Sequence, residues 1–211
     1  MCTNFIPTRN SQWVEAVFGV PLPSDYPAET YPGYLAPIVL KGRKSAKTVC
    51  GLARFGLIPA WAKDAKIGRH TYNARTETVS SKPSFRSAWA KGQFALVLVE
   101  AFFEPNYETG KAVRWRIEAA DQIPFAIAAL WDRWVNPKGE SVVSFTMLTI
   151  NADTHPVMRQ FHKPADEKRT PVVISKENYD AWLSSKTIEA AKFLSLGQMP
   201  ELVSESDNKR G

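Results

Sequence analysis

The stretch FALVLVEAFFE, residues 94–104, carries apolar side chains at nine of its eleven positions. Successive side chains of a β-strand point to opposite faces, so such a run predicts a central strand that is covered on both sides. The segment AVRWRIEA, residues 112–119, instead alternates apolar with charged residues. This alternation predicts a strand with one buried face.

Further apolar runs on either side of these segments extend the pattern. We expect strands over residues 34–40, 47–59, 93–104, 112–119, 125–135 and 142–150. Short helices are expected over residues 11–18, capped by Ser11, and over 84–91, 153–161, 176–183 and 188–194. The pattern predicts an α+β fold: one compact, β-rich domain spanning residues 1–211, with small peripheral helices. Residues 201–211 are polar and are expected to form a flexible tail.

Length and composition restrict the class of protein. The chain has 211 residues, two cysteines and no apolar run near the ~20 residues that span a bilayer. Residues 1–20 lack the basic and apolar regions of a signal peptide. We therefore expect a cytoplasmic, reduced protein. The net charge of +6 is compatible either with simple solubility or with a polyanionic partner such as nucleic acid.

The chain opens with Met1 and Cys2. If Met1 is removed, Cys2 carries a free α-amine and a thiol on adjacent carbons, which is a 1,2-aminothiol. No other position in a chain can provide this pair. The other cysteine, Cys50, lies in an expected strand and is interpreted as an inert core thiol.

Two segments next to the apolar strands carry groups suited to chemistry. Residues 72–86, YNARTETVSSKPSFR, supply Asn73, Arg75 and Arg86, whose amide and guanidinium groups suit the binding of a phosphorylated substrate. The alternative interpretation of this segment is a solvated loop without a binding role. Glu104 follows an apolar strand, where a buried carboxylate suits a general acid. The alternative interpretation is that Glu104 only ends the strand and forms an ion pair with an arginine.

Residues 154–171 hold His155 and His162 together with the basic residues Lys163, Lys168 and Arg169. Either histidine is suited to proton transfer beside a phosphate, or to capping local structure. His70 is expected to be a surface residue or a phosphate contact.

Trp61 lies near two lysines, where an exposed ring can stack on a base. No Walker A, GxGxxG or HExxH motif is present, so we expect no metal and no cofactor.

Taken together, these segments resemble the SRAP family of abasic-site DNA–protein crosslinking proteins. The matching segments are MC (1–2), FGLIPAWAKD (55–64), NARTETV (73–79), PSFRSAW (83–89), FFE (102–104), AIAALWDRW (126–134), LTINAD (148–153), FH (161–162) and RTPVVIS (169–175). The resemblance covers about residues 1–185. It implies a mixed sheet or open barrel with a positively charged groove for single-stranded DNA, and Cys2 at its base.

The resemblance also implies the reaction. The α-amine of Cys2 would form a Schiff base with the aldehyde of an abasic site, and the thiol would close a thiazolidine ring that shields the site in the DNA damage (SOS) response. It assigns catalytic roles to Cys2, Asn73, Glu104 and His162. It assigns DNA contacts to Arg75, Arg86 and Trp61. From the basic character of their segments we also expect DNA contacts from Lys163, Arg169 and His70. A peptidase activity that removes Met1 and a weak abasic-site lyase activity are implied as side reactions.

Two other functions are compatible with these residues. One is an N-terminal-nucleophile amidohydrolase or peptidase, in which the α-amine is the base for the Cys2 thiol. The other is a DNA-binding module without covalent chemistry. The expected partner is single-stranded DNA with abasic sites, and the expected state is a monomer in the cytoplasm, associated with the nucleoid in a bacterium.

Overall fold

The long strand β5 (Phe94–Asn106) organises the sheet of this protein. In the computed structural model, which describes residues 2–42 and 46–207, its first half pairs with β2 and β7, and its second half pairs with β1 and β6. Alternate side chains of its first half enter two different hydrophobic clusters. The apolar run is therefore a central strand with both faces buried, as the sequence predicts.

Five strands close a barrel of mixed direction in the order β7, β8, β3, β2 and β5, because β5 also pairs with β7. Only the β3–β8 pair of this barrel is parallel. The bounds of the strands described so far are β1 (Phe5–Pro7), β2 (Leu35–Lys41), β3 (Thr48–Phe55), β6 (Val113–Ala119), β7 (Phe125–Val135) and β8 (Ser141–Asn151). Additional short strands are β4 (Asn73–Arg75), β9 (Arg169–Pro171), β10 (Val173–Ile174) and β11 (Leu202–Ser206). The expected β-rich α+β fold is confirmed.

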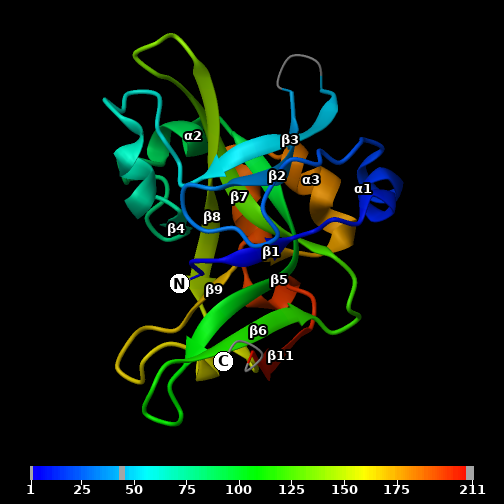
Figure 1. Cartoon of the computed structure of the whole chain (residues 1–211), viewed down its shortest axis with the longest axis vertical. Coiled ribbons are helices and arrows are strands. Elements are labelled where there is room, and N and C mark those ends of the chain that lie inside the picture. Colours follow the sequence, from blue (N-terminus) through cyan, green and yellow to red (C-terminus); the bar gives the residue numbers. More distant parts are fainter. Residues whose placement is uncertain (1, 43–45, 208–211) are drawn as a thin grey trace.

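The two hydrophobic clusters lie inside and outside the barrel. The inner cluster draws residues from all five barrel strands and includes Cys2 and Phe5. The outer cluster includes Val14, Ala88 and Trp182, which come from helices α1 (Ser11–Phe18), α2 (Arg86–Ala90) and α3 (Tyr179–Ser184). Figure 1 shows α1 and α3 on one side of the barrel strands and α2 on the other. No helix in the described ranges is long and apolar enough to cross a membrane.

Several expected elements need correction. Helix α1 has the expected bounds, but its cap is Asn10, whose side chain accepts a hydrogen bond from the Trp13 N–H at 2.9 Å. The helix expected over 153–161 is only a 3₁₀ turn, η2 (Met158–Gln160). The helix expected over 188–194 is divided between α4 (Thr187–Ala190) and η4 (Ala191–Phe193). The remaining 3₁₀ turns are η1 (Ala65–His70), η3 (Lys176–Asn178) and η5 (Leu196–Gln198).

Strand β3 ends at Phe55, earlier than the expected residue 59, because the chain turns at Gly56. This glycine has φ +107°, and a Cβ there would lie 2.2 Å from the carbonyl oxygen of Gly68. Only glycine permits this backbone and this close approach. After the turn the chain stays attached to the barrel, since the Ile58 N–H donates to Ser144 Oγ of β8 at 2.8 Å.

The prediction of a flexible tail over residues 201–211 is wrong for residues 202–206. These residues form β11, which pairs antiparallel with β6 and buries Leu202. The free edge of β6 offers backbone donors and acceptors, which a polar sequence satisfies as well as an apolar one. Residues 208–211 lie outside the described residues.

Candidate functional site

Cys2 is held at the end of β5 by the strand that follows it. In this antiparallel pair Phe5 lies opposite Phe102, and the carbonyl oxygen of Asn4 accepts a hydrogen bond from the Phe103 N–H at 3.2 Å. The N-terminal segment therefore runs toward Glu104. The Cys2 side chain is fully buried, and its Sγ donates a hydrogen bond to the Asn4 carbonyl oxygen at 3.4 Å.

Burial raises the pKa of the Cys2 thiol well above its usual value, and the nearby negative charge of Glu104 raises it further. The resting thiol is therefore protonated at neutral pH. A reaction that uses its sulfur must give that proton a destination.

Asn73 contacts Cys2 although the two residues are far apart in the sequence. It begins β4, which runs parallel to β8 with Asn73 opposite Met147. Its side-chain Nδ2 donates a hydrogen bond to the Cys2 carbonyl oxygen at 2.7 Å. The segment 72–86 thus starts as a strand rather than the expected loop, and its amide orients the backbone of Cys2.

Glu104 and His162 form a buried pair beside Cys2. The Glu104 side chain is fully buried, and its Oε2 lies 2.9 Å from His162 Nε2. His162 has the uncommon φ of +65°, and its N–H donates to the Pro105 carbonyl oxygen at 2.9 Å. The preceding Phe161 is buried and packs edge-on against Trp115. This anchor and the left-handed turn direct the imidazole toward the carboxylate.

His155 has a different position. Its Nδ1 accepts hydrogen bonds from the N–H groups of Val157 and Met158, each at 3.1 Å, so it caps a local turn. Burial lowers its pKa. Of the two histidines in this segment, His162 is the one that contacts Glu104. The structure therefore brings Cys2, Asn73, Glu104 and His162 together, which is the set expected to be catalytic.

The chemical capacity of this cluster follows from its parts. It combines a thiol, a carboxylate whose Oε2 lies 2.9 Å from an imidazole nitrogen, and an amide that holds the backbone of the thiol residue. These groups suit attack on a carbonyl carbon with proton transfer to and from its oxygen.

Trp61 lies outside the cluster on an anchored loop. Its side chain is 57% exposed, and its Nε1 donates to the Pro83 carbonyl oxygen at 3.3 Å. The loop is fixed to β7, since the Trp134 Nε1 donates to the Ala62 carbonyl oxygen at 2.7 Å. A large exposed ring on a rigid loop suits stacking against a base.

The remaining expected DNA contacts differ in exposure. Arg86, Lys163 and His70 are exposed. Arg75 is also exposed, and its Nη1 lies 2.8 Å from Glu167 Oε2. None of these side chains joins the Cys2 cluster.

Arg169 has a structural position that the sequence did not indicate. It is 2% exposed, and its guanidinium donates to both Glu77 oxygens at 2.9 Å and to Glu167 at 2.7 Å. It also donates to the buried Thr149 carbonyl oxygen at 2.6 Å. Its Nη donors are therefore bound within the protein, and Arg169 is not among the proposed DNA contacts. Its partner Glu77 is 92 residues away along the chain, too far for a local pattern to reveal it, whereas Glu167 is its near neighbour in the sequence.

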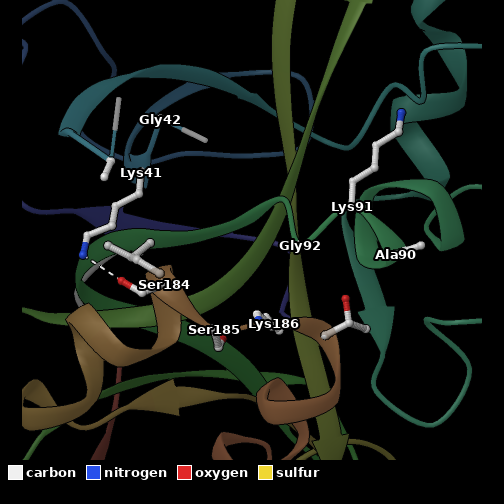
Figure 2. A pocket seen from close by; sticks show the side chains of 11 residues that line it. Lys41, Gly42, Ala90, Lys91, Gly92, Ser184, Ser185 and Lys186 are labelled. Carbon is white, nitrogen blue, oxygen red and sulfur yellow. Dashed lines mark hydrogen bonds between the residues drawn. The ribbon is translucent and has the colours of Figure 1, made fainter. Parts of the chain in front are cut away.

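A surface pocket of about 380 Å³ lies apart from this cluster. Its lining comes from the end of β2, the end of α2 and the segment that follows α3 (Figure 2). Lys41 Nζ donates to Ser184 Oγ at 2.7 Å and pairs with Asp180, so its ammonium is already bound. The lining includes none of the cluster residues.

Comparison with known proteins identifies the family. The family model described as SOS response associated peptidase (SRAP) matches residues 1–206. The chain belongs to the SRAP family. The match extends beyond the expected residue 185 and includes β11, which is consistent with the pairing of β11 on the sheet.

Curated relatives of this SRAP protein are named abasic site processing proteins. YoqW of Bacillus subtilis is 34% identical over 149 residues, which is 70% of this chain and 63% of YoqW. HMCES of Rattus norvegicus is 25% identical over 135 residues, which is 47% of this chain and 36% of HMCES. The matched part of the SRAP chain thus spans less than two thirds of either relative.

Solved structures show the same fold. A crystal structure of a protein from Bordetella bronchiseptica matches with a TM-score of 0.86 and 31% identity, covering 97% of this chain and 99% of that one. A protein from Bacteroides thetaiotaomicron matches with a TM-score of 0.78 at 22% identity, covering 97% and 91% of the two chains. The second likeness concerns the fold alone.

Proposed function

We propose that this SRAP protein processes abasic sites: it binds single-stranded DNA and, once Met1 is removed, forms a covalent thiazolidine link through Cys2. The names of its curated relatives support the substrate class. The observation that carries the proposal is the burial of Cys2 beside the Glu104–His162 pair, with Asn73 bound to its carbonyl oxygen.

The proposed reaction has two covalent steps. The α-amine of Cys2 attacks the C1′ aldehyde of the ring-opened sugar, and loss of one water leaves a C=N double bond. The imine nitrogen takes up a proton from the Glu104–His162 pair and becomes an iminium. The thiol sulfur then adds to the iminium carbon. An S–C bond forms, the C=N electron pair moves to nitrogen, and the thiol proton returns to the pair. The product is a thiazolidine, and one water is released overall.

The site suits this order of events. The resting thiol is protonated, because burial and the charge of Glu104 raise its pKa. A cationic iminium formed next to the thiol opposes the charge of Glu104 and so lowers the thiol's pKa again. Sulfur addition would therefore follow imine formation. Ring closure removes the imine, which would otherwise hydrolyse or allow strand cleavage by β-elimination.

The other residues receive roles in this scheme. Glu104 and His162 would transfer protons during sugar-ring opening and loss of water. Asn73 would hold Cys2 against the sugar. Trp61 would stack on a base, while Arg75, Arg86, Lys163 and His70 would contact phosphates, which the net charge of +6 favours.

The proposal is tested by intact-mass analysis of the purified protein, before and after incubation with a uracil-containing single-stranded oligonucleotide treated with uracil glycosylase. We expect loss of Met1 and a heat-stable adduct that Cys2→Ala abolishes, with binding of undamaged DNA retained. Retained Met1, or an adduct that forms equally in Cys2→Ala, would contradict the proposal. A protein that lacks Met1 but forms no adduct would instead favour an N-terminal-nucleophile amidohydrolase.

A further inference from the structure

Glu29 is the centre of a polar network next to the N-terminal segment. Its Oε1 accepts a hydrogen bond from Asn4 Nδ2, from the Tyr31 hydroxyl at 2.7 Å and from Arg114 Nη2. The Glu29 side chain is only 14% exposed, and Asn4 is buried. A carboxylate with three donors in such a place is strongly oriented.

Arg114 of β6 binds the Glu29 carboxylate and is itself held in place. Its guanidinium lies over the Phe103 ring, 3.5 Å from the centroid, and its Nη1 lies 3.5 Å from Asp207 Oδ2. The backbone N–H of Asp207 also donates to the Arg114 carbonyl oxygen at 2.9 Å. The end of β11 and the aromatic ring thus fix Arg114, and Arg114 fixes Glu29.

Asn4 connects this network to the nucleophile. Its side chain is bound by Glu29, while its carbonyl oxygen accepts from the Cys2 thiol at 3.4 Å and from the Phe103 N–H at 3.2 Å. Any rotation of the Asn4 peptide would move the acceptor of the thiol. Asn73 holds the Cys2 backbone from the other side.

We propose that Glu29 is a positioning residue for Cys2: through Asn4 it fixes the peptide whose carbonyl oxygen orients the thiol. The role in crosslinking rests on the proposed function, but the effect on the thiol does not. If Glu29 is removed, the buried Asn4 amide loses its acceptor and residues 2–4 sample other conformations. The rate at saturating DNA falls in proportion to the fraction of molecules that keep the productive conformation.

The test uses a Cys50→Ser background, so that Cys2 is the sole thiol of the chain. Glu29→Ala is compared with Glu118→Ala, a matched control. Glu118 also pairs with an arginine of β6, at 2.8 Å from Arg116 Nε, and its side chain is 21% exposed. The control therefore removes a similar ion pair from the same strand without touching Asn4.

Four quantities are measured for each variant: the rate of Cys2 alkylation by iodoacetamide without DNA, the crosslinking rate at saturating abasic oligonucleotide, the affinity for an oligonucleotide with an unreactive tetrahydrofuran abasic analogue, and the Tm. For Glu29→Ala we expect alkylation to rise at least ~10-fold and crosslinking to fall ~10-fold, with affinity within about twofold of the parent. Glu118→Ala should change neither rate by more than about twofold.

A second variant pair keeps the proposal falsifiable if Glu29→Ala folds poorly. Asn4→Asp places two carboxylates together and should slow crosslinking, whereas Asn4→Asp combined with Glu29→Gln restores a donor–acceptor pair and should recover most of the rate. Unchanged alkylation in Glu29→Ala, or no recovery in the double variant, overturns the positioning role. If the parent forms no adduct while Glu29→Ala still raises alkylation, the proposed function fails and the positioning role stands.

Discussion

Replacement of Glu104 by glutamine is the sharpest test of the chemistry proposed for the cluster. The amide has nearly the same volume as the carboxyl group, and its oxygen can still face His162 Nε2, which lies 2.9 Å from the carboxylate. The substitution therefore removes the charge and the exchangeable proton with little change of packing. It should act on the rate rather than on the fold.

The expected change in rate follows from two opposing effects of the Glu104 charge. A positioned general acid or base typically contributes 10²–10⁴ in rate, and we expect a loss of roughly 100-fold in imine formation, about 2.7 kcal/mol of activation free energy. The charge of Glu104 also raises the pKa of the Cys2 thiol. Its removal lowers that pKa and favours the sulfur-addition step, so the loss should appear only in the first step.

The assay separates the two steps. Borohydride trapping reports the Schiff base, and heat-stable adduct on a denaturing gel reports the closed ring. Affinity for the unreactive abasic analogue should stay within about twofold of the parent.

Glu100→Gln is the matched control for this substitution. Glu100 also lies on β5, but its Oε1 accepts hydrogen bonds from Thr8 Oγ1 and the Arg9 N–H, each at 3.2 Å. The reasoning is refuted if Glu104→Gln crosslinks at the parent rate, or if both variants lose the same activity.

Three further predictions concern residues outside the cluster. Arg86→Ala should weaken binding of single-stranded DNA and reduce the slope of log affinity against log salt by roughly 0.7; an unchanged slope would exclude a phosphate contact. Arg169→Met should lower the free energy of unfolding by about 2–3 kcal/mol, because the charged hydrogen bonds to Glu77, Glu167 and the Thr149 carbonyl oxygen are lost, and should leave the salt slope unchanged. If denaturant unfolding shows a decrease of less than about 1 kcal/mol in the free energy of unfolding, this structural role is contradicted. Burial lowers the pKa of His155 in the folded protein. As the pH falls below about 6.5, this histidine is therefore protonated in the unfolded chain before it is protonated in the folded one, and the free energy of unfolding decreases. His155→Asn keeps an acceptor for the same backbone N–H groups and should reduce the loss of stability between pH 7.5 and 5.5; an identical loss would contradict it.

Local sequence patterns predicted the long elements well. The run 94–104 indicates burial on both faces whatever its neighbours are, and helix α1 follows from its own apolar periodicity. The three-residue strands β1 and β4 were not predicted, because each exists only through pairing with a distant strand. The same reason explains the error over residues 202–206, whose composition is that of a tail but whose partner is the edge of β6.

The candidate site divides in a similar way. The place of Cys2 in the chain and the apolar neighbours of Glu104 suggested both residues from the sequence. Asn73 and His162 were also candidates, and the resemblance to the SRAP family gave them catalytic roles. Arg169 shows the limit of this approach, since a positive charge in a basic stretch indicated a phosphate contact. The fold surrounds it instead with Glu77 and Glu167.

The sequence by itself determined the β-rich class, the central strand and the presence of a thiol at residue 2. Periodicity and composition are local properties, and they report burial directly. Only the tertiary structure decided which polar groups meet: the Cys2 carbonyl with Asn73, Glu104 with His162, and Asn4 with Glu29. A buried polar group must find a partner wherever the fold places one, and the closing of the barrel brings those partners together from distant parts of the chain.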